Sequence, residues 1–249
     1  MPGEARIRVY GELNDFLPPD ERGRDQRLRF DVAPSVKDAV ESLGVPHVEI
    51  ERIFAEGRPV DWGDPLRDGQ RLAVYPQFRR LEAGSEGALR PPPPRPTRFV
   101  LDVHLGRLAA YLRMLGFDCL YSNDAGDEEL AEAACRDHRI LLTRDRGLLM
   151  RRVVVYGYFV RETAPRLQAV EVAERYRLAE ELAPFTRCLQ CNSALEAVAK
   201  EEILAQVPPR TAAIHDDFRR CRSCRRVFWQ GSHHRRMLEI VEQIRSRAA

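Results

Sequence analysis

The chain has 249 residues, a hydrophobic content of 44% and a formal net charge of +2 at neutral pH. This length fits one large domain or two small domains with an appendage, and the hydrophobic content is sufficient for true cores. The nearly neutral charge by itself says nothing about nucleic-acid binding, and no apolar run approaches the roughly 20 residues of a membrane span.

The cysteine usage points to a reducing compartment. Six cysteines in a chain of this length do not resemble a secreted disulfide framework. The chain does not open with the basic-then-apolar pattern of a signal sequence. We therefore expect a cytoplasmic protein without a membrane partner.

Residues 1–80 are expected to form a separate domain. Alternating apolar residues predict strands at 6–11, 28–32, 53–55 and 71–75. Between the second and third of these strands, Ser35 is in position to cap a helix that ends at Gly44. One face of this helix carries Val36, Ala39, Val40 and Leu43. The order ββαββ in so short a segment predicts an α+β β-grasp fold.

Three pieces of this segment carry a resemblance: RVYGEL near its start, Asp38-Ala39-Val40 on the helix, and GRPVDWGDPLRDGQRLAVYP near its end. They resemble the ubiquitin-like sulfur carriers of thiamine and molybdopterin synthesis. Such carriers act through a free C-terminal Gly-Gly, whereas this chain continues into Pro76-Gln77-Phe78. A sulfur-transfer role therefore rests on the resemblance alone. We expect a docking or structural domain that recruits a protein or ribosomal partner.

Residues 81–97 are predicted to be a linker, because they contain Gly84, Gly87, the run Pro91 to Pro94, and Pro96. Glycine loosens such a segment, and a proline run stiffens it into an extended spacer. This is the clearest domain boundary in the sequence.

Residues 98–184 alternate between strand and helix patterns. Strands are predicted at 99–101, 117–121 and 140–142, with a fourth inside 153–160. Helices are predicted at 105–115, where Gly116 closes an apolar face, and at 127–138 and 165–176. Repeated βα units imply an α/β fold, with a parallel sheet flanked by helices on both faces.

Three carboxylates lie after the ends of the first three predicted strands. Asp102 directly follows the first strand, Asp127 opens the helix after the second, and Asp145 lies just beyond the third. Since the carboxyl ends of parallel strands share one edge of a sheet, we expect these acids to meet there. Carboxylates in close proximity repel one another, and Mg²⁺ or Mn²⁺ would remove the conflict. Such a cation can activate water for phosphodiester hydrolysis.

The residues around Asp145 fit the same chemistry. Thr143 could support a ligating carboxylate or bind phosphate, and Arg144 and Arg146 could contact the RNA backbone. Each acid also has a simpler interpretation, because Asp127 could complement a helix dipole and Asp102 could cap a helix. The three together favour a site. Asp118 and Asp124 are weaker candidates.

The segments FVLDVHLGRLAAYLRMLGFD, DEEL and RILLTRDRGLL resemble the PIN-like ribonuclease domain first named from the C-terminus of the Mut-seven exonuclease. The resemblance covers residues 99–235, and a ubiquitin-like N-terminal partner is a known arrangement in that family. It implies that the acidic positions fall on Asp102, Asp127 and Asp145, with Thr143 beside the last. PIN domains often have a fourth acid. Glu162 is the one guess here, so the number of metal ions stays open.

Residues 185–249 are predicted to be a zinc ribbon with a basic C-terminal tail. Cys188 and Cys191 form one CxxC pair, and Cys221 and Cys224 form a second one after 29 intervening residues. Each pair offers two thiolates to one tetrahedral Zn²⁺, so structural zinc is favoured over a redox dithiol. We expect the other two cysteines, Cys119 and Cys135, to be buried small apolar residues.

The segment from Arg219 to Arg236 holds seven arginines and no acid, with Phe228 and Trp229 among them. Clustered arginines with aromatic residues are typical of RNA binding. The alternative is a solvated basic ribbon in which the aromatic residues form a small core. His233 and His234 are expected to be surface residues. The RNA-binding candidates are Arg144, Arg146, Arg222, Arg225, Arg226 and Trp229.

These observations predict a metal-dependent ribonuclease with catalytic Mg²⁺ or Mn²⁺ and structural Zn²⁺. The alternative is a non-catalytic RNA- or ribosome-binding adaptor. In that case the acids cap helices and the basic ribbon does the binding.

Overall fold

The computed structural model describes residues 2–77 and 87–248. The chain divides into two compact units. The first comprises Met1–Pro93 and Asp127–Phe159, and the second comprises Pro94–Gly126 and Val160–Ala249. Residues 78–86, which include the end of the expected first domain and residues 81–86 of the expected linker, lie outside the described residues.

The first unit contains the expected β-grasp sheet. Its strands are β1 (Gly3–Val9), β2 (Gln26–Phe30), β3 (Ile50–Ala55), β4 (Arg58–Pro59) and β5 (Arg71–Pro76), in the order β2-β1-β5-β3-β4. β1 pairs parallel with β5 and antiparallel with β2, and β3 pairs antiparallel with β4 and β5. The predicted ββαββ order is confirmed, whereas the short β4 was not predicted.

Helix α1 (Val36–Glu41) begins where the sequence predicts, because Ser35 Oγ accepts a hydrogen bond of 3.1 Å from the Asp38 N–H. Two 3₁₀ helices, η1 (Gly11–Phe16) and η2 (His47–Glu49), complete the domain. The apolar face of α1 packs against alternate residues of the strands, and this makes one core. That core includes Ile7, Val9, Val36, Val40, Ile53, Leu72 and Val74.

The end of the expected linker is attached to the β-grasp sheet. Leu89 donates a hydrogen bond of 3.0 Å to the Glu51 carbonyl, and its own carbonyl accepts one of 3.2 Å from the Trp62 indole N–H. Arg90 donates to the carbonyls of Val48 and Ile50 at 2.5 and 3.0 Å. Residues 89–90 therefore belong to the packed domain and not to a free spacer.

The alternating βα segment contributes two strands to each compact unit. The strands are β6 (Arg98–Leu101), β7 (Asp118–Leu120), β8 (Ile140–Thr143) and β9 (Gly157–Phe159). The pairs β6–β7 and β8–β9 are parallel, as predicted. The helices are α2 (Gly106–Met114), α3 (Asp127–Arg136), α4 (Arg146–Leu149) and α5 (Pro165–Tyr176), together with the 3₁₀ helix η3 (Val103–Leu105).

Gly116 ends α2 for a steric reason. Its φ is +102°, and a Cβ at this position would lie 2.2 Å from the carbonyl oxygen of Ala183. The prediction that Gly116 closes the helix is confirmed. The same contact brings the chain after α5 close to the end of α2.

The C-terminal part of the second unit contains an antiparallel sheet in the order β10-β11-β12. Its strands are β10 (Leu195–Val198), β11 (Phe218–Cys221) and β12 (Val227–Trp229). With α6 (Pro209–Ile214) and the 3₁₀ helices η5 (Lys200–Glu202) and η6 (Leu204–Gln206), it encloses a small core. We call this region, with its four cysteines, the four-cysteine ribbon.

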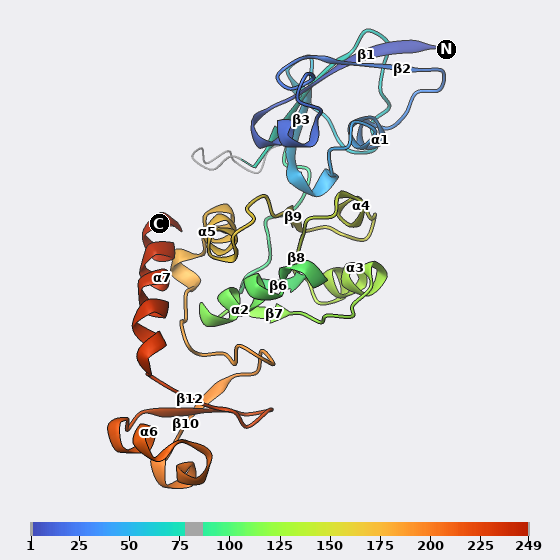
Figure 1. Cartoon of the computed structure of the whole chain (residues 1–249). Helices are drawn as coiled ribbons and strands as arrows, with labels where there is room; N and C mark the ends of the chain where they lie inside the picture. Colours follow the sequence, from blue (N-terminus) through green and yellow to red (C-terminus); the bar gives the residue numbers. More distant parts are fainter. Residues whose placement is uncertain (1, 78–86, 249) are drawn as a thin grey trace. The chain divides into compact units, whose positions relative to one another are not determined.

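The C-terminal segment, expected to be a basic tail, forms the last helix, α7 (Ser232–Ala248). It packs beside α5, and Figure 1 shows the two helices next to each other, α5 in yellow-orange and α7 in red. Ile240, Val241 and Ile244 are buried on its inner face. The 3₁₀ helix η4 (Leu178–Glu181) also contacts α7. None of the helices in the described part of the chain is long and apolar enough to cross a membrane.

Candidate functional site

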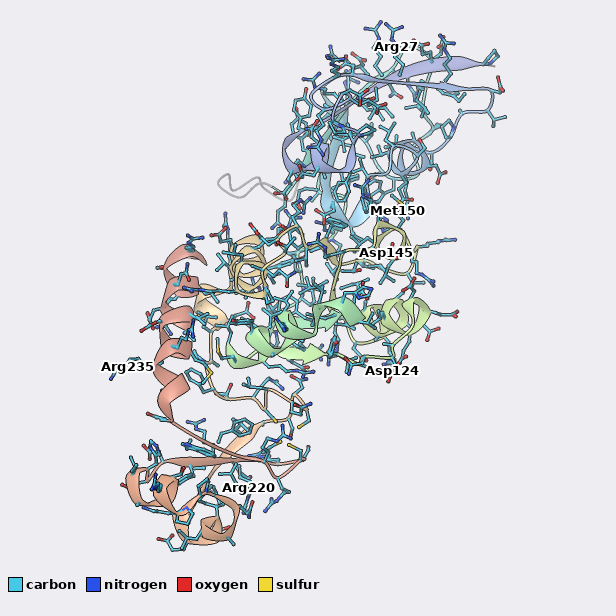
Figure 2. The ribbon with its side chains drawn as sticks, in the orientation of Figure 1. Arg27, Asp124, Asp145, Met150, Arg220 and Arg235 are labelled. Atoms are coloured by element: carbon cyan, nitrogen blue, oxygen red, sulfur yellow. The ribbon has the colours of Figure 1, made fainter. Side chains whose placement is uncertain are left out.

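The turn after β8 holds Asp145 by backbone hydrogen bonds. Thr143 is fully buried, and its Oγ1 accepts a bond of 2.9 Å from the Asp145 N–H. Asp145 Oδ1 in turn accepts bonds from the N–H groups of Gly147 (2.7 Å) and Leu148 (3.3 Å). Asp145 is therefore the N-cap of α4, and its exposed side chain is labelled in Figure 2.

The turn after β6 holds Asp102 differently. Asp102 is 7% exposed, and in the described structure its side chain makes no cap bond to the 3₁₀ helix that follows. Tyr121 stabilises this turn by donating to the Val103 carbonyl at 2.8 Å. A Cβ on Gly106 would lie 2.5 Å from the Tyr121 hydroxyl, so a larger residue here would displace the Tyr121 side chain.

Asp127 is the first residue of α3 and is exposed, with Glu128 and Glu129 beside it in the first turn. Asp127 and Asp145 belong to the first compact unit, and Asp102 belongs to the second. That the three acids form one metal site stays a prediction. That Thr143 supports Asp145 in such a metal site also stays a prediction.

The weaker acids occupy separate places. Asp118 accepts a hydrogen bond of 2.8 Å from the Asn192 side-chain amide, which gives it a structural partner. Asp124 is exposed in the loop after β7 (Figure 2). The backbone N–H of Glu162 is bound at 3.0 Å by the carboxylate of Glu171 on α5. The number of metal ions stays open.

Arg146 is engaged within its own unit. Its guanidinium donates a bond of 2.8 Å to the Phe16 carbonyl and lies 5.2 Å from the centroid of the Phe16 ring. Both contacts link the turn of Asp145 to the β-grasp domain. RNA binding by Arg144 and Arg146 stays a prediction.

The four cysteines of the two CxxC pairs come together. The sulfur atoms of Cys188, Cys191, Cys221 and Cys224 all lie within 4.8 Å of one another. The Cys188–Cys224 and Cys191–Cys221 sulfurs are 3.7 and 3.3 Å apart. Tetrahedral zinc with bonds of about 2.3 Å separates its sulfurs by roughly 3.8 Å, so this donor set fits the ion.

The thiols of this cluster have opposite electrostatic environments. Burial raises the pKa of Cys188 to about 12, so a thiolate there needs the charge of a cation. Burial alone would raise the pKa of Cys221. The backbone N–H groups of Cys224 and Ser223 and the neighbouring thiols have the larger, opposite effect and lower the pKa to about 6. A divalent cation would therefore displace a proton from Cys188 on binding.

Two polar side chains fix the first CxxC pair to the α/β sheet. Arg113 of α2 is 5% exposed and donates to the Cys119 carbonyl and to the carbonyls of Leu189 and Gln190 at 3.1 and 3.0 Å. Asn192 accepts a bond of 3.0 Å from the Cys119 N–H. The four-cysteine ribbon is thereby attached to β7 within the second unit.

The ribbon arginines share an acidic partner that sequence reasoning missed. Glu196 of β10 lies within 4.0 Å of Arg220 and 3.9 Å of Arg225, and Arg222 donates to it at 3.2 Å. Arg226 donates to the Gln190 side chain at 3.3 Å. Arg222 and Arg225 remain mostly exposed. Such exposed ion pairs contribute little to stability.

Of the other predictions for the cysteines and aromatic residues, some are confirmed and some are wrong. Cys119 is buried as expected, but Cys135 is exposed, because it faces outward on α3. Trp229 is 38% exposed and Phe228 is half-buried, while the ribbon core is formed by Val198, Ile203, Val207, Ala212 and Phe218. The alternative in which both aromatic residues form that core is wrong. The side chain of His233 lies outside the described residues.

Arg113, Asn192 and Glu196 are structural residues of this site that the sequence did not reveal. Arg113 is buried on α2 although it follows Leu112 directly and so lies off the predicted apolar face, which is why its burial was not predicted. Asn192 has a φ of +67°, a conformation that asparagine tolerates and that is common directly after a turn. The sequence signal for its structural role was its position directly after Cys191.

Fold and site together define an α/β domain with parallel strands that carries a four-cysteine metal-binding ribbon, preceded by a β-grasp domain. A family model described as the Mut7-C RNAse domain matches residues 97–241, and one described as Mut7-C ubiquitin matches residues 3–82. Because the first match covers more than half of the chain, the protein belongs to the Mut7-C RNase domain family. The resemblance seen in the sequence is thereby confirmed. No curated protein and no solved structure gives a significant match.

Proposed function

We propose that the protein is a ribonuclease that hydrolyses phosphodiester bonds of RNA with the help of Mg²⁺ or Mn²⁺. The observation that carries the proposal is the match of residues 97–241 to the Mut7-C RNAse domain. In this proposal Asp102, Asp127 and Asp145 bind the metal, and Thr143 supports the last of them.

The local geometry of Asp145 supports its role. Its Oδ1 is held by two backbone N–H groups, which fix the carboxylate and leave Oδ2 as the atom for a cation. Thr143 fixes the backbone of Asp145 from a buried position. Asp102 is a buried carboxylate in the turn after β6, where the proposal needs a metal ligand. The bound cation would supply Lewis acidity and an activated water.

The four-cysteine ribbon completes the proposal. We assign it a structural zinc ion, because four thiolates leave no coordination position for a substrate. Arg222, Arg225 and Arg226 would contact RNA phosphates, with Trp229 and Arg144 as further contacts. Thiols kept for a metal suit a reducing compartment, so we place the protein in the cytoplasm.

One observation favours a second candidate, a non-catalytic RNA- or ribosome-binding adaptor. Asp145 caps α4, which is what a purely structural carboxylate would do at this position. In an adaptor the ribbon would bind RNA and the acids would only stabilise the fold.

The variant Asp145→Asn separates the two candidates. An asparagine Oδ1 accepts the same two N–H bonds, so α4 keeps its cap while the site loses a charge. Purified, zinc-loaded protein is incubated with labelled single-stranded and structured RNAs, with Mn²⁺ or without added divalent metal. We expect Mn²⁺-dependent products from the wild type and a rate at least roughly 100-fold lower in the variant.

The control is Asp20→Asn, an exposed acid of the β-grasp domain outside the candidate site, which should cleave at the wild-type rate. Omitting Mn²⁺ is preferable to a chelator, because a chelator would also attack the four-cysteine ribbon. RNA binding without any product in Mn²⁺ would support the adaptor. Full activity in Asp145→Asn would contradict the assignment of that residue.

A further inference from the structure

A pocket of about 180 Å³ lies beside the four-cysteine ribbon, in the second compact unit. Its walls come from all three ribbon strands, from the chain that precedes the first CxxC pair, and from the first turns of α7. The lining includes Phe185, Leu195, Asp217, Arg219, Phe228, Trp229, Gln230, His234 and Met237.

Strand register explains one wall of the pocket. Arg219 of β11 is directly opposite Phe228 of β12, so the two side chains share one face of the ribbon sheet. On the same strand Phe218 belongs to the ribbon core. Alternation along β11 therefore separates a core residue from a pocket residue. Trp229, opposite Phe218 in the register, is the last residue of β12, so it lines the pocket from the end of the strand, and it is 38% exposed.

The opposite wall is held in an unusual backbone conformation. Phe185 has a φ of +60°, which is rare for a large side chain and is retained where the surroundings enforce it. Its N–H donates to the Met114 carbonyl at 2.9 Å, and its carbonyl accepts a bond of 3.3 Å from Arg219. The Phe185 ring lies 4.7 Å from the His234 ring, centroid to centroid. Phe185 is thus held in place at the pocket by its backbone bonds and by the His234 ring.

The chemistry of the lining matches one class of ligand. Aromatic faces stack on nucleobases, and a guanidinium contacts phosphate or stacks on a base. Asp217 and Gln230 offer a carboxylate and an amide, which can hydrogen-bond the edge of a base. The volume is below the roughly 300–1,000 Å³ of pockets that hold drug-sized molecules, so a single planar ring system fits best.

A second hollow continues the first. Leu189 and Met237 line both, and the second also presents Arg166, Arg236 and Tyr111. Two arginines beside a pocket for a base would suit the phosphates of the neighbouring nucleotides.

We propose that this pocket binds one unpaired nucleobase of a single-stranded RNA, with Phe185, Phe228 and Trp229 as the stacking residues and Arg219 as the cationic partner. The inference rests on the proposed function, because it takes RNA as the substrate. It adds that recognition by the ribbon depends on bases as well as phosphates. Paired bases are stacked in a duplex and cannot enter.

Binding is measured by fluorescence anisotropy with a short labelled oligouridylate and with the same strand carrying abasic positions. The protein is the zinc-loaded full chain, and no Mg²⁺ or Mn²⁺ is added, so that cleavage does not interfere. We expect the wild type to bind the base-containing strand roughly tenfold more tightly than the abasic one. Phe185→Leu and Trp229→Leu should lose this preference and retain the affinity for the abasic strand.

The charge contribution has a matched control. Arg219→Gln should weaken binding of the base-containing strand more than Arg235→Gln. Among the described residues Arg235 lies outside the pocket lining, exposed on α7, where Figure 2 labels it. Zinc content and thermal unfolding show whether each variant is folded. If Phe185→Leu does not fold, the exposed positions Trp229 and Arg219 decide the outcome.

Equal affinity of the wild type for the two strands would overturn the proposal, and so would a preference that survives in both Trp229→Leu and Arg219→Gln. The result is independent of hydrolysis. A base preference in a protein that yields no Mn²⁺-dependent products would refute the nuclease and keep the pocket. Mn²⁺-dependent cleavage without any base preference would refute the pocket and keep the nuclease.

Discussion

At the residue scale, a few buried polar side chains determine where the functional segments lie. Arg113 bonds three backbone carbonyls, one on β7 and two in the first CxxC pair. Asn192 binds the same strand from the other direction, through the Cys119 N–H and the Asp118 carboxylate. These bonds join the first CxxC pair and Asn192 to α2 and β7, and the bonded residues are 73 to 77 positions apart in the sequence.

Replacing Arg113 with methionine tests this role. Methionine keeps much of the side-chain volume but removes every donor, so the carbonyls of Cys119, Leu189 and Gln190 lose their partner. We expect a loss of about 3 kcal/mol in the free energy of unfolding, since hydrogen bonds to charged groups are worth about 1.5–3 kcal/mol each and are not additive. Urea unfolding measures the change. The control is Arg107→Met on the same helix, where the exposed side chain predicts a near-neutral result, and an equal loss in both variants would contradict the assignment.

At the scale of elements, the sequence predicted what local patterns encode. Helix α5 was predicted over 165–176 and is observed over Pro165–Tyr176, because proline favours the first turn and the apolar periodicity is continuous. Helix α4 was missed because four residues are too few for a periodic pattern. Helix α7 was missed because its arginines concealed the spacing of Ile240, Val241 and Ile244.

The four-cysteine ribbon is the element whose stability depends most on a metal. Its core contains only Val198, Ile203, Val207, Ala212 and Phe218 among the described buried residues, which is too little for a segment of this length to fold alone. We therefore expect zinc removal to unfold β10, β11 and β12 while the β-grasp sheet stays folded. Hydrogen exchange of the backbone amides, with and without a zinc chelator, measures both regions in one experiment.

A cysteine pair provides the matched variants for this experiment. Cys188→Ser should abolish binding of one zinc ion per chain, whereas Cys135→Ser, at an exposed free cysteine of α3, should leave it unchanged. Full exchange protection of β10 to β12 in the zinc-free protein would show that the ribbon folds without metal.

At the scale of the whole molecule, the β-grasp domain and residues 127–159 form one compact unit. Arg146 binds Phe16, the buried Glu49 accepts a bond of 2.5 Å from the Phe159 N–H, and the Phe16 and Phe159 rings pack edge to face at 5.4 Å. These partners are 110 to 143 residues apart in sequence, so no local pattern could reveal them. The expected docking domain is docked within its own chain, on the segment that carries Asp145.

His47 makes this contact sensitive to pH. One ring nitrogen lies 2.7 Å from Glu41 and the other 3.0 Å from the Val154 carbonyl. Both partners accept hydrogen bonds, which favours the protonated ring. Burial opposes protonation more strongly, with the charge of Lys37 acting in the same direction, and the pKa of His47 is lowered below its ordinary value of 6.5.

The sign of the effect follows from this direction. Just below pH 6.5 the unfolded chain binds a proton at His47 while the folded chain does not, so the free energy of unfolding should fall as the pH drops below 6.5. Urea unfolding at several pH values between neutrality and mild acid measures this slope. Because other groups titrate as well, the decisive quantity is the difference between the wild type and His47→Gln, whose amide does not titrate. The wild type should lose more stability on acidification than the variant, and parallel slopes would show that His47 has no part in the pH dependence.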